Sequence, residues 1–145
     1  MIAIASDHAG FELKQHLVRV LTSNGYELMD LGCDSPSSVS YPEYGEKAAN
    51  AVARGEAGFA IIICGTGLGI SMAANKVRGI RAALCTSEYM ARMARMHNDA
   101  NVLALGARVV GQGLAESIAE AFLTTEFEGG RHATRVQQIM DIEKK

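Results

Sequence analysis

A segment in which glycines alternate with other residues, Cys64-Gly65-Thr66-Gly67-Leu68-Gly69, directly follows the apolar run from Phe59 to Cys64 and opens a helical pattern. Such a turn directs successive backbone N–H groups outward, where they can bind a phosphate or a developing oxyanion. The partial positive charge of the helix N-terminus also favours the thiolate form of Cys64. The residues alone leave two interpretations open: a thiol base beside an anion hole, or an inert buried cysteine with Thr66 as a helix cap.

Three familiar anion-binding motifs do not fit this segment. It lacks the Gly-Lys-Ser/Thr of a P-loop, and it follows the third β-type run, whereas the dinucleotide fingerprint follows the first. No arginine lies between Cys64 and Lys76 to close a phosphatase cradle. A hydrolytic thiol mechanism is therefore disfavoured.

Two further segments carry side chains suited to acid–base chemistry. Ser6-Asp7-His8-Ala9-Gly10 follows the first β-type run, where Ser6 or Asp7 could simply cap the next helix, although a cap needs no histidine. His97-Asn98 ends the fourth helical pattern, where a histidine can also act only by compensating the helix dipole. Asp7, His8 and His97 are thus candidates for a role in proton transfer or binding.

Three arginines could hold a phosphate group. Arg131 and Arg135 are four residues apart and share one face if the last helix extends back that far, and Arg108 follows the fifth β-type run. The alternative is that they form part of a solvated surface.

Short β-type runs alternate with helical patterns along the whole chain and must position these residues. The runs are Ile2 to Ala5, Tyr26 to Leu31, Phe59 to Cys64, Arg81 to Cys85 and Val102 to Leu105. The third run is apolar on both faces, as strands buried in a parallel sheet are. In such sheets ligands bind beyond the carboxyl ends of the strands, where the Cys64 and Asp7 segments fall.

The helical patterns predict helices on both faces of that sheet. The first carries an apolar stripe from Leu13 to Leu21 and ends near Gly25, and the second begins with a capping box in which Ser40 precedes Glu43. The others are Ile70 to Lys76, Ser87 to Met96, Leu114 to Leu123 and Thr134 to Ile142. We therefore predict a three-layer α/β/α sandwich with a five-stranded parallel, Rossmann-like (flavodoxin-like) sheet and an extra C-terminal helix.

This topology separates two of the candidate residues. The end of the fourth helix lies at the opposite edge of the sheet from Cys64, so His97 and Cys64 can serve one site only if they come from different subunits.

Length and composition limit the classes of function. The 145 residues predict one domain, 1–145, and a net charge of −2 offers no basic field for a nucleic acid or an anionic membrane. The longest apolar stretch is far shorter than the about 20 residues of a membrane helix. Three widely spaced cysteines without a CxxC pair predict reduced thiols, neither a disulfide framework nor a zinc knuckle. We expect a soluble, cytoplasmic protein.

The motifs together resemble ribose-5-phosphate isomerase type B, a family that includes the subunits of galactose-6-phosphate isomerase. The resemblance runs from Ala3 to about Glu143 and rests on the order and spacing of five short motifs. They are Ser-Asp-His-Ala-Gly-Phe at 6–11, Ile-Cys-Gly-Thr-Gly-Leu-Gly-Ile-Ser at 63–71, Ala-Ala-Asn-Lys at 73–76, His-Asn-Asp at 97–99, and Gly-Gly-Arg-His at 129–132 with Arg135 beyond.

The resemblance implies an aldose–ketose isomerase without a cofactor or metal, in a homodimer or dimer of dimers whose sites are shared between subunits. Cys64 would move a proton between C2 and C1, and Thr66 would shuttle one between the oxygens. Some members use a glutamate base where this chain has Ile70, which cannot accept a proton. The remaining roles are an anion hole (Gly65, Gly67, Leu68, Gly69), ring opening (Asp7, His97), sugar positioning (Tyr41, Asn98) and phosphate binding (His8, Arg108, Arg131, Arg135).

The expected reaction interconverts D-ribose 5-phosphate and D-ribulose 5-phosphate, a step of the non-oxidative branch of the pentose phosphate pathway. Two alternatives stay open. A six-carbon substrate, allose 6-phosphate or galactose 6-phosphate, would use the same chemistry. A non-catalytic phosphate-sensing domain would be expected to carry a phosphorylatable aspartate after the third strand, where Cys64 stands instead.

Overall fold

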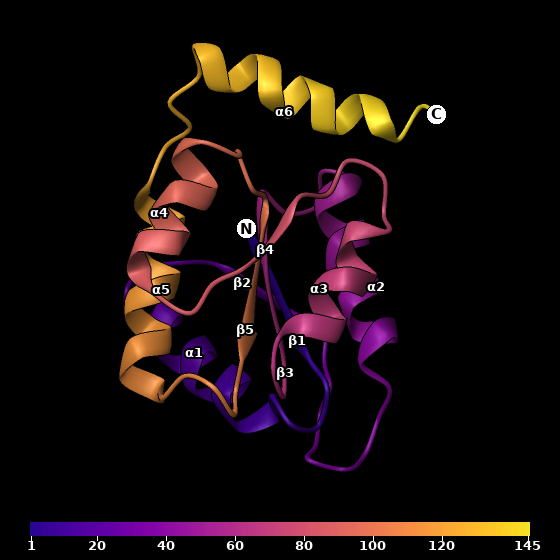
Figure 1. Cartoon of the computed structure of the whole chain (residues 1–145). Helices are drawn as coiled ribbons and strands as arrows, with labels where there is room; N and C mark the ends of the chain where they lie inside the picture. Colours follow the sequence, from indigo (N-terminus) through magenta and orange to yellow (C-terminus); the bar gives the residue numbers. More distant parts are fainter.

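Five strands and six helices alternate along residues 1–145, all of which the computed structural model describes (Figure 1). The strands are β1 (Ile2–Ser6), β2 (Leu28–Asp30), β3 (Phe59–Cys64), β4 (Ala82–Leu84) and β5 (Val102–Gly106). The helices are α1 (Phe11–Ser23), α2 (Tyr41–Ala53), α3 (Leu68–Asn75), α4 (Glu88–Met96), α5 (Gln112–Thr124) and α6 (Arg131–Ile142).

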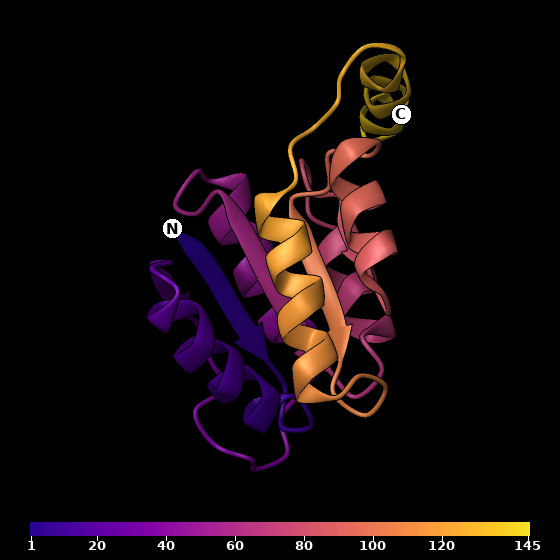
Figure 2. The same cartoon turned by 90° about the vertical axis from the view of Figure 1, so that its left-hand side faces the viewer.

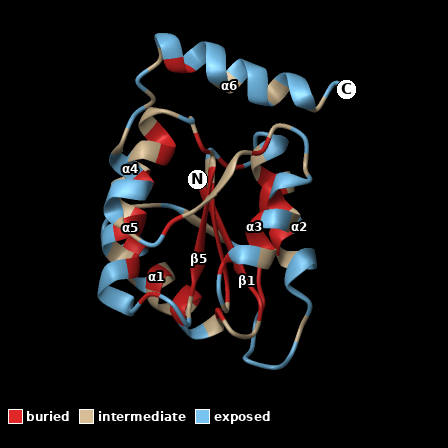
Figure 3. Ribbon diagram, viewed as in Figure 1, coloured by how far each residue is buried: buried red, intermediate tan, exposed pale blue.

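The strands form one parallel sheet with helices on both faces, as predicted. Helices α1, α4 and α5 cover one face, while α2 and α3 cover the other (Figures 1 and 2). Alternate residues of β3 enter two separate cores: Ile61 and Ile63 pack on the side of α1 and α5, and Ile62 packs on the side of α2 and α3. Packing on both faces explains why β3 is apolar throughout. Figure 3 shows the strands of the sheet coloured largely as buried.

The strand order is β2-β1-β3-β5-β4. It differs from the flavodoxin-like order 2-1-3-4-5 because the last strand inserts between β3 and β4. Cys64 therefore pairs in register with Gly106. Past these strand ends, the N–H groups of Ala107 and Arg108 donate to the carbonyls of Cys64 and Gly65, both at 2.9 Å. The loops that follow β3 and β5 are thus joined side by side.

The ends of the elements follow the sequence signals only in part. Gly25 adopts φ +96° just after α1, as expected of a left-handed helix terminus. Ser40 occupies the N-cap of α2, but its side chain makes no capping hydrogen bond, so the predicted capping box is wrong. Strands β2 and β4 are shorter than the apolar runs that predicted them.

Helix α6 stands apart from the sandwich and crosses it at the amino ends of the strands (Figures 1 and 2). It begins at Arg131, three residues before the predicted start, so Arg131 and Arg135 lie one turn apart on one helix. It is exposed along most of its length, with His132 as its one buried residue (Figure 3). None of the helices is both long and apolar enough to cross a membrane.

Candidate active site

A cavity of about 300 Å³ lies at the carboxyl ends of β1 and β3, beside the loop that follows β5. Half of the predicted site residues line it: Asp7, Tyr41, Cys64, Gly65, Thr66, Gly69 and Arg108. They come from four separate stretches of the chain, which the parallel sheet brings together at the carboxyl ends of its strands. The cavity therefore lies where ligands bind in this class of sheet.

Cys64 is buried at the end of β3, and its sulfur faces the start of α3. The backbone N–H of Gly67, the N-cap residue of α3, donates a hydrogen bond to Cys64 Sγ at 3.1 Å. A helix N-terminus with N–H groups directed at sulfur stabilises negative charge on it. The geometry suits a thiolate that accepts a proton.

At two positions of this loop only glycine fits, because a Cβ would collide with neighbouring atoms. Gly67 has φ +81°, and a Cβ there would lie 2.5 Å from Leu84 Cδ1. A Cβ on Gly69 would lie 2.5 Å from Cε1 of the Tyr41 ring. The loop therefore packs against β4 and α2 with no room for side chains, which leaves its backbone N–H groups close to the cavity.

Thr66 and Leu68 are linked within this loop. The N–H of Leu68 donates to Thr66 Oγ1 at 3.2 Å, so Thr66 does act as a local cap. The hydroxyl hydrogen stays available, because Oγ1 is the acceptor in that bond. Thr66 can thus cap the loop and also donate into the cavity that it lines.

Asp7 does not cap α1, whose N-cap residue is Gly10 and which has no side-chain capping bond. Its Oδ1 accepts the N–H of Gly10 at 3.1 Å, which fixes the turn into α1. The residue is buried and also lines the cavity. The bond to Gly10 holds the carboxylate in place beside the cavity, which fits a functional role.

His8 is held by a bond to a neighbouring loop. The N–H of Val39 donates to its Nδ1 at 3.1 Å. The neutral ring therefore carries its proton on Nε2, which leaves an N–H donor for an anion. Because the loop after Gly32 also leads to Tyr41, this bond ties His8 to the segment that delivers the tyrosine.

The remaining predicted residues, His97, Asn98, Arg131 and Arg135, lie at the opposite edge of the sheet. His97 follows α4 at the amino end of the neighbouring β5, and both arginines are exposed on α6. The six residues of β3 span about 20 Å between the two edges. One chain therefore does not bring His97 to Cys64, as the topology predicted.

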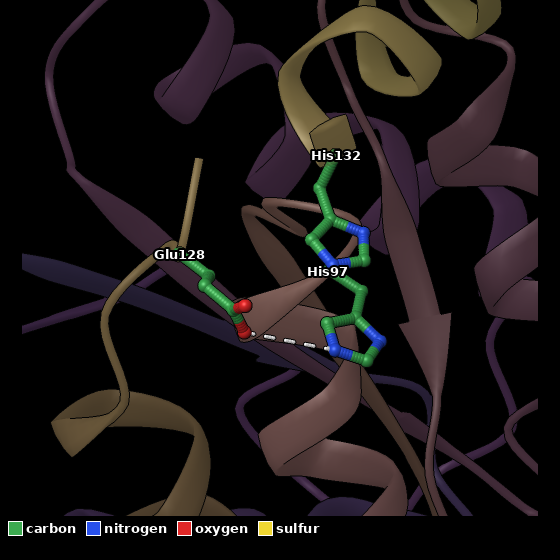
Figure 4. Close-up of side chains that lie close together, drawn as sticks. All are labelled: His97, Glu128 and His132. Atoms are coloured by element: carbon green, nitrogen blue, oxygen red, sulfur yellow. Dashed lines mark ion pairs between the residues drawn. The ribbon is translucent and has the colours of Figure 1, made fainter. Parts of the chain in front are cut away.

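His97 sits in a cluster that the sequence analysis missed (Figure 4). Its ring stacks on that of His132 with centroids 4.1 Å apart and planes at 9°, and its Nε2 lies 3.8 Å from Glu128 Oε2. Burial, and next the neighbouring His97, lower the pKa of His132. The only sequence signal for this cluster was the position of His132 beside Arg131. His97, Glu128 and His132 are also the only three metal-ligating side chains in the chain that lie close enough together to hold a metal ion.

The other two cysteines lie away from the cavity. Cys33 and Cys85 are buried and free, and no disulfide forms. Burial raises the pKa of the Cys85 thiol to about 11. Of the three thiols, only Cys64 lines the cavity.

Comparison with known proteins shows which family has this fold and these motifs. Residues 2–139 match the family model described as Ribose/Galactose Isomerase. The chain belongs to the ribose/galactose isomerase family. It is 50% identical over 144 residues to ribose-5-phosphate isomerase B of Escherichia coli, covering 99% of this chain and 97% of that protein.

Solved structures of the ribose/galactose isomerase family share the fold over nearly the whole chain. Ribose-5-phosphate isomerase B of Clostridium thermocellum is 59% identical, with a TM-score of 0.98 over 99% of this chain and 97% of that one. The Mycoplasma genitalium enzyme, solved with bound ribulose-5-phosphate, is 41% identical, with a TM-score of 0.94 over 99% and 96%. The resemblance stated from sequence motifs is confirmed.

Proposed function

We propose that this protein interconverts D-ribose 5-phosphate and D-ribulose 5-phosphate through an enediolate, in the non-oxidative branch of the pentose phosphate pathway. One observation carries the proposal: a buried thiol accepts a backbone N–H at the start of a helix, inside a polar cavity. The family membership supports it, since the solved relative from Mycoplasma genitalium holds ribulose-5-phosphate.

Cys64 is the base in this scheme. Its thiolate removes the proton from C2 of the open-chain aldose and returns it to C1, while Thr66 Oγ1 relays the hydroxyl proton from O2 to O1. The backbone N–H groups of the loop, from Gly65 to Gly69, stabilise the negative oxygen of the enediolate. Each such donor contributes about 3 kcal/mol in comparable sites.

Ring opening and sugar positioning each involve one residue of the cavity and one from the other end of the strands. We assign Asp7 and His97 to the proton transfers that open the furanose, and Tyr41 and Asn98 to holding the sugar. Asp7 and Tyr41 line the cavity with Cys64, which supports their part in this assignment.

The phosphate group would bind at the rim of the cavity. His8 is suited to this because Val39 fixes the tautomer that leaves Nε2–H free to donate. Arg108 lies against Gly65, and Arg131 and Arg135 would complete the set of cations. Binding the distant phosphate fixes the reacting carbons over the thiolate.

A complete site requires two chains, and we infer a homodimer or a dimer of dimers. The separation of His97, Asn98, Arg131 and Arg135 from Cys64 within one chain supports this. Exposed apolar side chains around the edge strand β4, Leu68, Met72, Tyr89 and Met90, offer a surface that a partner could cover. Three buried free thiols suit a reducing compartment, so we place the protein in the cytoplasm.

The test measures the conversion of ribose 5-phosphate to ribulose 5-phosphate by wild type, Cys64→Ala and Cys85→Ala. We expect the Cys64 variant to lose about 10²- to 10⁴-fold in kcat, because the base is gone, and the Cys85 control to keep its activity. Circular dichroism establishes that each variant is folded.

Two outcomes would overturn parts of the proposal. Turnover of only allose 6-phosphate or galactose 6-phosphate by the wild type would reassign the substrate. Full activity of folded Cys64→Ala would show that another residue moves the proton.

A further inference from the structure

We propose that His97, Glu128 and His132 form a binding site for a zinc-type divalent cation. The three side chains come from the end of α4, the segment before α6 and the first turn of α6. One candidate ligand atom from each lies within 4.8 Å of the others. Two imidazoles and one carboxylate are a ligand set that zinc uses where it keeps a fourth position open.

An unsatisfied atom supports this assignment independently of the clustering. The Nε2 of His132 is buried and has no hydrogen-bond partner, and the residue as a whole is only 7% exposed. Buried polar atoms in native proteins are nearly always paired. The other two such atoms, His16 Nε2 and Glu120 Oε2, belong to side chains with a polar partner, Glu116 and Tyr26, each at 3.2 Å, whereas the His132 side chain has none. Figure 4 shows this ring lying over His97 with the Glu128 carboxylate beside the pair.

Coordination needs only local adjustment of the side chains. The two rings are parallel, so at least one must turn to direct its nitrogen at a shared ion. Rotation of an imidazole about χ2 meets a broad, shallow energy profile. Tetrahedral zinc with bonds of about 2.1 Å holds its ligand atoms about 3.4 Å apart, and exposed Glu128, outside any helix, can close the remaining distance.

The surrounding charges determine the affinity of the site for a cation. Arg131 and Arg135 face His132 and repel a cation, whereas Glu128 attracts one. The site is therefore expected to bind more weakly than a structural zinc centre. In the single chain the side chains of His97 and Glu128 are 37% and 51% exposed.

The site has a consequence that rests on the proposed function. Zinc would occupy the imidazole of His97, which the sugar needs for ring opening in the partner's site. The cation would then act as a reversible inhibitor, and removal by EDTA would restore turnover.

The first experiment measures zinc binding without reference to activity. Isothermal titration with Zn²⁺, and the visible spectrum of added Co²⁺, would compare wild type with His132→Gln and Glu128→Gln. We expect each variant to bind at least about tenfold more weakly. The matched control is His16→Gln, because His16 pairs with Glu116 at 3.2 Å but has no third ligand, and this variant should bind as wild type does.

Cys64→Ser distinguishes the cluster from the one thiol that lines the active-site cavity. Zinc binding that persists in this variant supports the cluster, and binding that vanishes in it while surviving in His132→Gln overturns the proposal. Wild type that binds no zinc also overturns it. Zinc that binds at the cluster without slowing turnover would leave the site established and remove His97 from the proposed reaction.

Discussion

The three cysteines of this chain differ in what surrounds each sulfur. Cys64 accepts a backbone N–H inside a cavity, whereas Cys85 is buried in the core with its pKa raised to about 11. Since alkylation proceeds through the thiolate, we expect iodoacetamide at pH 8 to modify Cys64 first and leave Cys85 unmodified. Peptide mass spectrometry against time gives the order of reaction.

Ribose 5-phosphate supplies the control for this reaction. It should slow the modification of Cys64 by occupying the cavity and leave any slow modification of Cys33 unchanged. Equal reactivity of Cys64 and Cys85 would contradict the difference that their surroundings imply.

Gly69 gives a second prediction for a single residue. A Cβ at this position would lie 2.5 Å from the Tyr41 ring, so Gly69→Ala must displace that ring from the cavity. We expect KM for the sugar phosphate to rise about tenfold or more, because Tyr41 is assigned to positioning. Steady-state kinetics of Gly113→Ala, a helical glycine with open space around it, should match wild type.

The cavity residues that directly follow strands could be predicted from the sequence, whereas Tyr41, which begins α2, came only from the family resemblance. Cys64, Asp7 and Arg108 fall where parallel strands end, and the structure brings them to one cavity. The roles of Glu128 and His132 could not be predicted, because neither lies in a strand-end position. Their contacts with His97 depend on how α6 folds back over α4, which no local pattern encodes.

At the scale of elements, an ion pair between a buried lysine and a half-exposed aspartate joins α1 to β2. Lys14 is 1% exposed, and its Nζ lies 2.7 and 2.9 Å from the two carboxylate oxygens of Asp30. Asp30 also accepts the N–H of Gly32 at 3.0 Å. The pair therefore anchors the loop that continues toward His8 and Tyr41.

The two ends of this pair should respond unequally to mutation. Asp30→Ala leaves a buried ammonium without its carboxylate and should lower the free energy of unfolding by about 3 kcal/mol. Lys14→Met removes the buried charge and leaves a half-exposed Asp30 that water can solvate, so we expect a loss of about 1 kcal/mol. Urea denaturation of both variants measures the difference, and equal losses would contradict it.

The elements themselves were predictable where burial sets their pattern. Strand β3 has the predicted bounds because both of its faces are buried and every residue is constrained. Strands β2 and β4 lie at the sheet edges, where one neighbour is missing and fewer residues pair. The insertion of β5 between β3 and β4 depends on contacts between distant parts of the chain, so it cannot be predicted from the periodicity of the sequence.

At the scale of the whole molecule, the site residues fall into two groups: the residues that line the cavity, and His97, Asn98, Arg131 and Arg135 at the other end of the strands. This division predicts how mixed oligomers behave. Cys64→Ala damages one group, and a double variant of Arg131→Ala and Arg135→Ala damages the other. Coexpressed in equal amounts and purified as the mixed population, they should recover about a quarter of wild-type activity, since half the dimers are hybrids with one intact site each.

A second mixture controls for this recovery. Cys64→Ala and Arg108→Ala fall in the same group, so every site in their hybrids carries one of the two defects. This mixture should show no more activity than its parents. No recovery in the first mixture would show that one chain builds its site alone. Recovery in the second would show that Cys64 and Arg108 reach one site from different chains.

In the proposed homodimer, the placement of the two groups at opposite ends of the same strands would also make turnover depend on the amount of protein. A chain of this family that separates from its partner keeps its core, because both cores lie within one sandwich. It would nevertheless hold only half of each active centre. Specific activity would therefore fall on dilution along the association equilibrium, with folded protein still present, and the abundance of the protein itself would regulate its catalytic output.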